Sequence, residues 1–208
     1  NRRMRNNEAL LMGAGRFKQG PGVLQLVGDE VKKYGNRALI VGSHTAWEKT
    51  EDTISESLAS QGIIFSVFQF SGYCSDLKTD DIAKSASEFG AQIILGVGGG
   101  RCLDAAKLGA KKARVRCMTV PTIAATCAAY VPLSVLYDDT GSSLYSVFMD
   151  NEMAGVICDT ELLATNSPRR MLASGIADAM AKEPEMFFSL KTVSQFDHSI
   201  LPPAGYHI

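Results

Sequence analysis

The sequence predicts an α/β fold in which helices cover both faces of a parallel sheet. Two observations carry this prediction. Short runs rich in Val, Ile, Leu and Phe alternate with helical stretches, and a run of glycines joins one strand directly to the next helix. The 208 residues allow one doubly wound domain, or one such domain and part of another. In sheets of this kind, ligands bind beyond the carboxyl ends of the strands.

The first two thirds of the chain supply the alternating elements. Four apolar runs have the composition of strands buried on both faces, at residues 38–41, 64–68, 93–97 and 117–120. Helices are predicted between them, over residues 46–61, 80–89 and 103–110. Gly62 and Gly90 follow the first two helices as C-caps. This order requires right-handed crossovers between parallel strands.

The pattern changes after Pro121. Residues 132–137 and 144–148 are strand-like, and the turn Asp138-Asp-Thr-Gly141 joins them, which predicts a hairpin. Residues 155–158 predict one more strand. A second domain therefore barely begins within this chain.

A last helix is predicted from its start signals. Ser167 has the N-cap position and Pro168 the first helical position, and the helix carries residues 175–182. We predict no continuation beyond Pro184, because no helical pattern follows it, and residues 201–205 have the composition of turn or coil.

Composition and charge argue against several function classes. The 21 Lys and Arg nearly balance the 22 Asp and Glu, so the chain has no excess of positive charge that would indicate binding to nucleic acid or anionic lipid. No apolar run reaches the roughly 18 residues that span a bilayer, and residues 1–13 lack the layout of a secretory signal. The five cysteines show no metal or redox spacing. We therefore expect a cytoplasmic protein without nucleic-acid or membrane partners, whose cysteines mostly fill the core.

The strongest signal for chemistry lies in residues 93–107. A buried strand runs into Gly98–Gly100 and then into a helix, which offers bare backbone amides and a positive helix end to phosphate or pyrophosphate. A tight turn without a ligand is the structural alternative. Asp104 and Lys107 can meet on one helical face, where an exposed pair would contribute about 0.2–0.5 kcal/mol.

A second candidate region follows the strand at residues 117–120. Thr122, Thr126 and Cys127 place small polar groups where a cleft is expected. Cys127 would need a base to act as a nucleophile, and no histidine stands near it in the sequence, so a packed thiol is the favoured interpretation.

A third candidate is Asp178, a carboxylate within an apolar helical run. Such a group usually has a partner, which can be a cation, a hydrogen-bond donor or a metal. The histidines His44, His198 and His207 show no ligand spacing with one another, and each is expected at the surface.

Taken in order, these segments resemble the glycerol-dehydrogenase-like branch of the iron-containing alcohol dehydrogenase superfamily. The resemblance covers about residues 9–185. It rests on four motifs: Arg16-Phe-Lys-Gln-Gly-Pro-Gly22, Gly98-Gly-Gly-Arg-Cys-Leu-Asp-Ala-Ala-Lys107, Pro121-Thr-Ile-Ala-Ala-Thr126 and Gly175-Ile-Ala-Asp-Ala179. Residues 126–134 are similar to bacterial hydroxycarboxylate dehydrogenases, which reduce 2-oxo acids with NADPH, whereas glycerol dehydrogenases carry Asp where this chain has Cys127.

The resemblance implies a Rossmann-like dinucleotide-binding domain over residues 1–160 and the start of an all-helical, metal-binding domain over 161–208. Asp178 matches the carboxylate metal ligand, and Cys127 is the candidate catalytic position in the substrate cleft. Residues matching the cofactor site are Gly98, Gly99, Gly100, Arg101 and Cys102 for the pyrophosphate, and Thr122, Ala125, Leu133 and Tyr137 for the nicotinamide half. The implied cofactors are NADP or NAD and a divalent metal, zinc or iron. A small-molecule substrate and a homo-oligomer are expected.

Two departures from the family pattern bear on specificity. The strand over residues 38–43 ends in Ser43 where NAD-preferring relatives place Asp, whose carboxylate would repel a 2′-phosphate, so NADP becomes tolerable. His44 next to it either assists a phosphate or is simply exposed. Cys127 in place of Asp removes a negative charge, which favours an anionic substrate over a neutral polyol.

The expected function is hydride transfer between NAD(P)H and a small 2-oxo or 2-hydroxy acid, with a divalent metal as Lewis acid. A glycerol or other polyol dehydrogenase is the alternative within the same family. A catalytically inactive nucleotide-binding fragment is the alternative from another class, because neither His198 nor His207 matches the family's metal-binding histidines. A flavodoxin-like FMN domain ranks last, since Trp47 is the sole tryptophan. An apolar patch is expected to be exposed near residues 175–186.

Overall fold

The computed structural model describes residues 13–138, 140–149 and 153–192. Its main sheet has six strands: β1 (Phe17–Gly20), β2 (Arg37–Ser43), β3 (Ile64–Phe70), β4 (Ile93–Gly98), β5 (Arg116–Pro121) and β8 (Gly155–Asp159). Neighbouring strands all run parallel, in the order β1-β8-β5-β4-β2-β3. Two further strands, β6 (Leu133–Tyr137) and β7 (Ser143–Phe148), form a separate antiparallel hairpin. The predicted sheet and the predicted hairpin are both confirmed.

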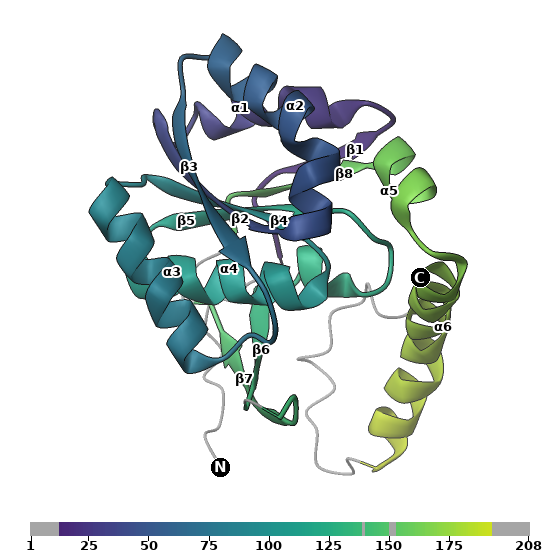
Figure 1. Cartoon of the computed structure of the whole chain (residues 1–208). Coiled ribbons are helices and arrows are strands. Elements are labelled where there is room, and N and C mark those ends of the chain that lie inside the picture. The colour runs from purple at the N-terminus through teal and green to yellow at the C-terminus, as the bar shows by residue number, and fades with distance from the viewer. Residues whose placement is uncertain (1–12, 139, 150–152, 193–208) are drawn as a thin grey trace.

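Helices cover both faces of this sheet (Figure 1). The helices of the described residues are η1 (Val23–Leu26), α1 (Val27–Val31), α2 (His44–Ser60), α3 (Asp76–Phe89), α4 (Gly100–Ala113), η2 (Cys127–Ala129), α5 (Thr160–Asn166) and α6 (Arg169–Thr192). On one face α1 and α2 pack in a core that includes Val27 and Ile54, and on the other face α3 and α4 pack in a core that includes Ile82 and Ala106. The sheet therefore lies between two apolar layers, as expected for a doubly wound fold.

The predicted helices are present, but their first turns begin earlier. α3 begins at Asp76, one turn before the predicted start, because the hydroxyl of Ser75 caps it. α4 begins at Gly100, inside the glycine run. Gly90 ends α3 with φ 70°, as predicted for a C-cap. The prediction that residues 64–68 are buried on both faces is wrong, because β3 is an edge strand and Ile64 is 56% exposed.

Three elements near the opposite edge of the sheet are not predicted by the sequence pattern: β1, α1 and α5. In β1 the one large apolar side chain, Phe17, is exposed, so the strand lacks the apolar run of the others. Asp159 at the end of β8 organises this region. Its carboxylate accepts hydrogen bonds from the amides of Gly22 (3.2 Å) and Leu24 (3.0 Å), and it also caps the first turn of α5.

The helix α6 differs from its predicted form at both ends. The hydroxyl of Ser167 accepts a hydrogen bond from outside the helix, and the carbonyl of Pro168 accepts the first helical bonds instead, so the predicted N-cap is wrong by one residue. The predicted end at Pro184 is also wrong, because the helix continues to Thr192. A proline removes one backbone donor, and the strong helix formers on both sides of it sustain the helix.

The sheet reverses its winding between β2 and β4. These strands are neighbours, but α2 leaves β2 toward one face and α4 leaves β4 toward the other. The two chain segments diverge at the carboxyl ends, which opens a crevice at the position where doubly wound folds bind ligands. None of the helices in the described residues combines the length and apolarity needed to cross a membrane.

Candidate functional site

A pocket of about 600 Å³ opens at this reversal point. Its walls come from the ends of β2 and β3, the first turn of α4, the loop after β5, the strand β6 and the first half of α6. Every predicted site residue except Gly98 and Thr122 lines it: Ser43, Gly99, Gly100, Arg101, Cys102, Ala125, Cys127, Leu133, Tyr137 and Asp178. A pocket of this size accommodates a small organic ligand or cofactor.

The glycine run divides into a structural part and a pocket-lining part. A Cβ on Gly98 would lie 2.9 Å from the Cβ of Cys102, and the Gly98 carbonyl accepts a hydrogen bond from the amide of Thr122 (3.1 Å). These two residues therefore support the wall from behind. Gly99 is the N-cap of α4 and has no side chain to satisfy the amides of the first turn. Gly99, Gly100 and Arg101 all line the pocket, so the positive end of α4 lies at its wall, where it suits an anion.

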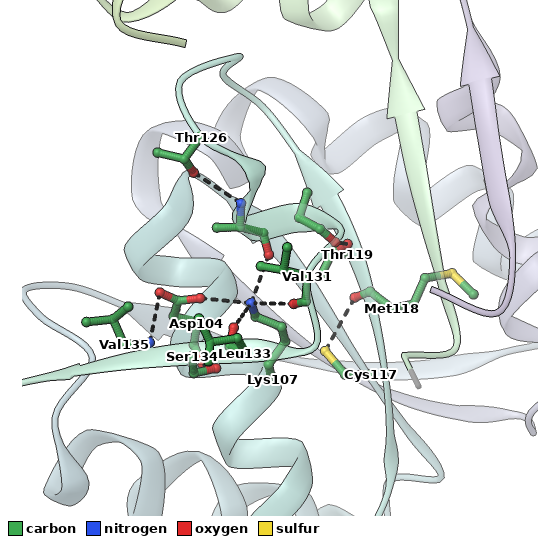
Figure 2. Close-up of polar contacts among 12 residues, drawn as sticks. Asp104, Lys107, Cys117, Met118, Thr119, Thr126, Val131, Leu133, Ser134 and Val135 are labelled. Atoms are coloured by element: carbon green, nitrogen blue, oxygen red, sulfur yellow. Dashed lines mark hydrogen bonds and ion pairs between the residues drawn. The ribbon is translucent and has the colours of Figure 1, made fainter. Parts of the chain in front are cut away.

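The opposite wall is held to α4 by a buried lysine (Figure 2). The ammonium group of Lys107 donates hydrogen bonds to the carbonyls of Ala128 (2.8 Å), Val131 (3.1 Å) and Leu133, and its side chain is fully buried. It also pairs with the carboxylate of Asp104 at 2.9 Å. One cation therefore fixes three successive points of the segment that leads from η2 into β6.

Asp104 extends this connection to the hairpin. Its carboxylate accepts from the amide of Val135 (3.3 Å), and its carbonyl accepts from the hydroxyl of Ser134 (2.9 Å). Burial raises the pKa of Asp104, while the neighbouring ammonium of Lys107 opposes that rise. The two residues meet as predicted, but the exposed-pair energy does not apply, because the pair is buried.

The cysteines differ sharply in their surroundings. Cys74, Cys102 and Cys117 are buried, and burial raises the pKa of each thiol to about 12, so all three thiols are unreactive. Cys74 and Cys117 fill the core, as predicted for most of the cysteines, whereas Cys102 also borders the pocket. Cys127 is exposed and lines the pocket, so the interpretation of it as a packed thiol is wrong. The reason is local: Thr126 caps the short helix η2 and leaves its first residue, Cys127, at the surface.

Close backbone contact brings α6 to the pocket. A Cβ on Gly175 would lie 2.2 Å from the carbonyl oxygen of Ala124, and the amide of Ala124 donates to the hydroxyl of Ser167 (2.9 Å). Only a glycine permits this approach. One turn later Asp178 lines the pocket, 3.4 Å from the ammonium of Lys182.

The described residues do not complete a metal site. Within residues 13–138, 140–149 and 153–192, no group of three or more His, Cys, Asp or Glu is arranged to hold a metal ion. Asp178 offers one carboxylate, and its near neighbour is a cation. His198 and His207 lie outside the described residues.

The end of β2 gives the pocket a neutral border. Ser43 lines it and precedes α2, and His44 is exposed beside Glu48, with 3.8 Å between Nδ1 and Oε2. Trp47, the sole tryptophan, does not line the pocket and is buried in the core edge-on to Phe65.

Several lining residues were not foreseen from the sequence. They are Phe70, Ser71, Gly72, Ile123, Ala128, Val135 and Met171. The first three could have been found, because they follow a predicted strand next to the reversal point. Met171 and Val135 carry no local signal, since only the packing of α6 and the hairpin brings them there.

Known proteins resemble this chain in sequence and in fold. The sequence profile of iron-containing alcohol dehydrogenases matches residues 14–160. A glycerol dehydrogenase of Pseudomonas putida is 36% identical over 171 residues, which cover 82% of this chain and 47% of that protein. Hydroxycarboxylate dehydrogenase A of Escherichia coli strain K12 is 41% identical over 115 residues, covering 54% of this chain and 31% of that protein.

A solved structure shows the same arrangement. The crystal structure of a probable glycerol dehydrogenase from Sinorhizobium meliloti 1021 matches with a TM-score of 0.76 at 27% identity, covering 85% of this chain and 47% of that one. The present chain thus spans about half the length of the curated relatives it matches. With the profile match over most of its length, the chain belongs to the iron-containing alcohol dehydrogenase family, in its glycerol-dehydrogenase-like branch.

Proposed function

We propose that the pocket binds NAD or NADP, with the diphosphate at Gly99 and Gly100. One observation carries this proposal: a helix begins with two glycines at the point where the sheet reverses, and these residues line a pocket of about 600 Å³. Diphosphate oxygens can approach bare amides closely, and the helix dipole favours their charge. Arg101 in the next position adds a positive charge.

The two ends of the pocket suit the two halves of a dinucleotide. Ala125, Leu133 and Tyr137 would border the nicotinamide, and the Lys107 network keeps their segment in place. Ser43 would border the adenosine ribose, where its neutral hydroxyl tolerates a 2′-phosphate. We therefore propose that NADPH binds at least as tightly as NADH.

We infer hydride transfer with a small 2-oxo or 2-hydroxy acid as the reaction. Bound NAD(P)H supplies or accepts the hydride. Cys127 borders the substrate space without the negative charge that a carboxylate would bring, which favours an anionic substrate. The similarity to hydroxycarboxylate dehydrogenase A supports this choice.

A polyol dehydrogenase is the second candidate. It is favoured by the relatives named glycerol dehydrogenase, which include proteins 36% and 33% identical to this chain. Comparing the reduction of small 2-oxo acids with the oxidation of glycerol, using one enzyme preparation, separates the two candidates. Faster turnover of glycerol would reject the 2-oxo acid assignment.

The role proposed for Asp178 is limited to one carboxylate ligand of a divalent metal, zinc or iron. The described residues hold no group of three or more His, Cys, Asp or Glu that would complete such a site around it. We further propose residues 1–160 as the dinucleotide-binding domain and 161–208 as the beginning of a helical domain, in a cytoplasmic homo-oligomer.

Titration of the protein with NADH and NADPH tests the binding proposal. Gly100→Val would place a branched side chain where a Cβ already comes within 3.2 Å of the hydroxyl of Thr126. We expect both dinucleotides to bind on the order of tenfold more weakly, because the diphosphate loses its access to the amides. Unchanged affinity in this variant would remove the glycine run from the binding site.

A further inference from the structure

The loop between β3 and α3 brings an aromatic ring to the pocket. Tyr73 follows two lining residues, Ser71 and Gly72, and its ring lies 5.0 Å from the guanidinium carbon of Arg101. A guanidinium within about 6 Å of a ring centroid is attracted by the negative face of the ring. Arg101 itself lines the pocket, directly after Gly100.

The ring of Tyr73 is held by the hairpin. The ring of Tyr137 lies 5.8 Å away, and the Tyr137 amide donates to the carbonyl of Cys74 (2.9 Å). Gly141 in the hairpin turn has φ +88°, and a Cβ there would come within 2.4 Å of Tyr73 Cζ. The hairpin, the β3–α3 loop and the start of α4 therefore meet at one aromatic ring.

Arg101 supplies the positive charge of the pocket. Among the described lining residues it is the one Lys or Arg, while the lining carboxylates Asp104 and Asp178 already have lysine partners. A long side chain loses rotamer freedom when it binds an anion, and this loss weakens binding. A side chain already held on a ring loses less.

We propose that Tyr73 is a positioning residue for dinucleotide binding, which holds the Arg101 guanidinium where it pairs with the diphosphate. This inference rests on the proposed function and adds a residue to it. The diphosphate, rather than a 2′-phosphate, is the partner because Arg101 stands beside Gly100 in the first turn of α4, whereas the neutral border for the ribose is Ser43 on β2. NADH and NADPH share this diphosphate, so Tyr73 should affect both equally.

A set of substitutions at Tyr73 and Arg101 tests the inference through the dissociation constants of NADH and NADPH. Tyr73→Leu should weaken both about two- to fivefold, because the released Arg101 side chain then loses its rotamer freedom on binding. Tyr73→Phe keeps the ring and should stay within twofold of the wild type. In the Arg101→Gln background, Tyr73→Leu should change neither constant further.

A substitution in the hairpin turn can displace the ring of Tyr73 while both Tyr73 and Arg101 stay unchanged. Gly141→Ala should displace Tyr73 and reproduce the effect of Tyr73→Leu, because the new Cβ would overlap the ring. Gly62→Ala is the matched control, with φ +64° and no atom within 4 Å of the added Cβ, and should leave binding unchanged.

The outcomes separate this inference from the proposed function. A wild-type protein that binds neither dinucleotide rejects the proposed function itself. If the wild-type protein binds both dinucleotides, two outcomes reject only the positioning role of Tyr73. One is a Tyr73→Leu effect on NADPH alone, and the other is a Tyr73→Leu effect of the same size with and without Arg101.

Discussion

At the scale of single residues, the pocket is defined by side chains that are small or missing. Gly99 and Gly100 line it without side chains, Gly175 lets α6 approach, and Ser43 and Cys127 are small and uncharged. Each of these positions removes bulk or negative charge from the pocket. The specificity of the protein should therefore respond to single substitutions that restore either.

Restoring a carboxylate at Ser43 tests the choice of cofactor. Ser43→Asp should lower the affinity for NADPH relative to NADH by about tenfold or more, because two negative charges would meet in a partly desolvated site. Fluorescence titration with each dinucleotide measures the ratio. The isosteric control Ser43→Asn adds no charge and should leave the ratio close to that of the wild type. Equal losses for the two dinucleotides would place the 2′-phosphate elsewhere.

The same logic applies to the substrate at Cys127. Cys127→Asp should lower kcat/KM for 2-oxo acids by on the order of tenfold and spare or improve glycerol oxidation, because the new carboxylate repels an anionic substrate. Cys127→Asn provides the uncharged control. If Asp and Asn have the same effect on both substrates, charge at this position does not set the preference.

At the scale of elements, the two walls of the pocket depend on each other. The segment from η2 to β6 has little regular structure of its own, and Lys107 of α4 replaces the missing backbone pairing with three hydrogen bonds (Figure 2). Fixing this segment also fixes the hairpin, because Asp104 binds Ser134 and Val135. The buried ion pair thus acts as a structural connection between elements.

Loss of the buried pair between Lys107 and Asp104 should destabilise the folded protein. Lys107→Met should lower the free energy of unfolding by about 3–5 kcal/mol, because it leaves the Asp104 carboxylate buried without its cation. Urea denaturation measures the change. Lys84→Met makes the same exchange in an exposed pair with Glu88 and should cost less than about 1 kcal/mol. Similar losses in the two variants would contradict the structural role of Lys107.

At the scale of the whole molecule, the sheet edges are joined to the helical layers by buried acids. Glu30 of α1 is 3% exposed and pairs with Arg16 just before β1 and with Lys33 at 2.6 Å. Burial opposes ionisation of Glu30, but hydrogen bonds from these cations outweigh it and lower its pKa from 4.5 to about 2.

Beyond the sheet, α6 extends away with Ile176 and Met180 exposed, as predicted for its apolar patch (Figure 1).

The lowered pKa of Glu30 predicts how acid affects stability. A folded-state pKa below the unfolded value means that the stabilisation is complete above pH 4.5 and is lost as the pH falls toward 2. Glu30→Gln should cost on the order of 1–3 kcal/mol at pH 7 and flatten the stability profile between pH 4.5 and 2. Unfolding measured across this range checks both. Glu88→Gln, in an exposed pair, should leave the dependence of stability on pH unchanged. If the stability of Glu30→Gln falls with pH in parallel with that of the wild type, Glu30 is not the group whose lowered pKa stabilises the fold.

The alternation of strands and helices, the glycine run at the start of α4 and the family motifs can all be recognised in the sequence. These are local features, in which apolar periodicity, caps and glycines act through residues near one another along the chain. The glycines after β4 could be predicted because strands of a parallel sheet end at one edge, whereas Leu133 and Tyr137 are implied only by the family resemblance.

The positions of these residues relative to the pocket depend instead on how the elements pack. This packing turned Gly98 away from the pocket, exposed Cys127, buried Lys107 against three carbonyls and carried α6 through Pro184. It also brought Tyr73 beneath Arg101. The physical reason is that burial and pairing depend on residues far apart in the sequence, which local periodicity does not encode.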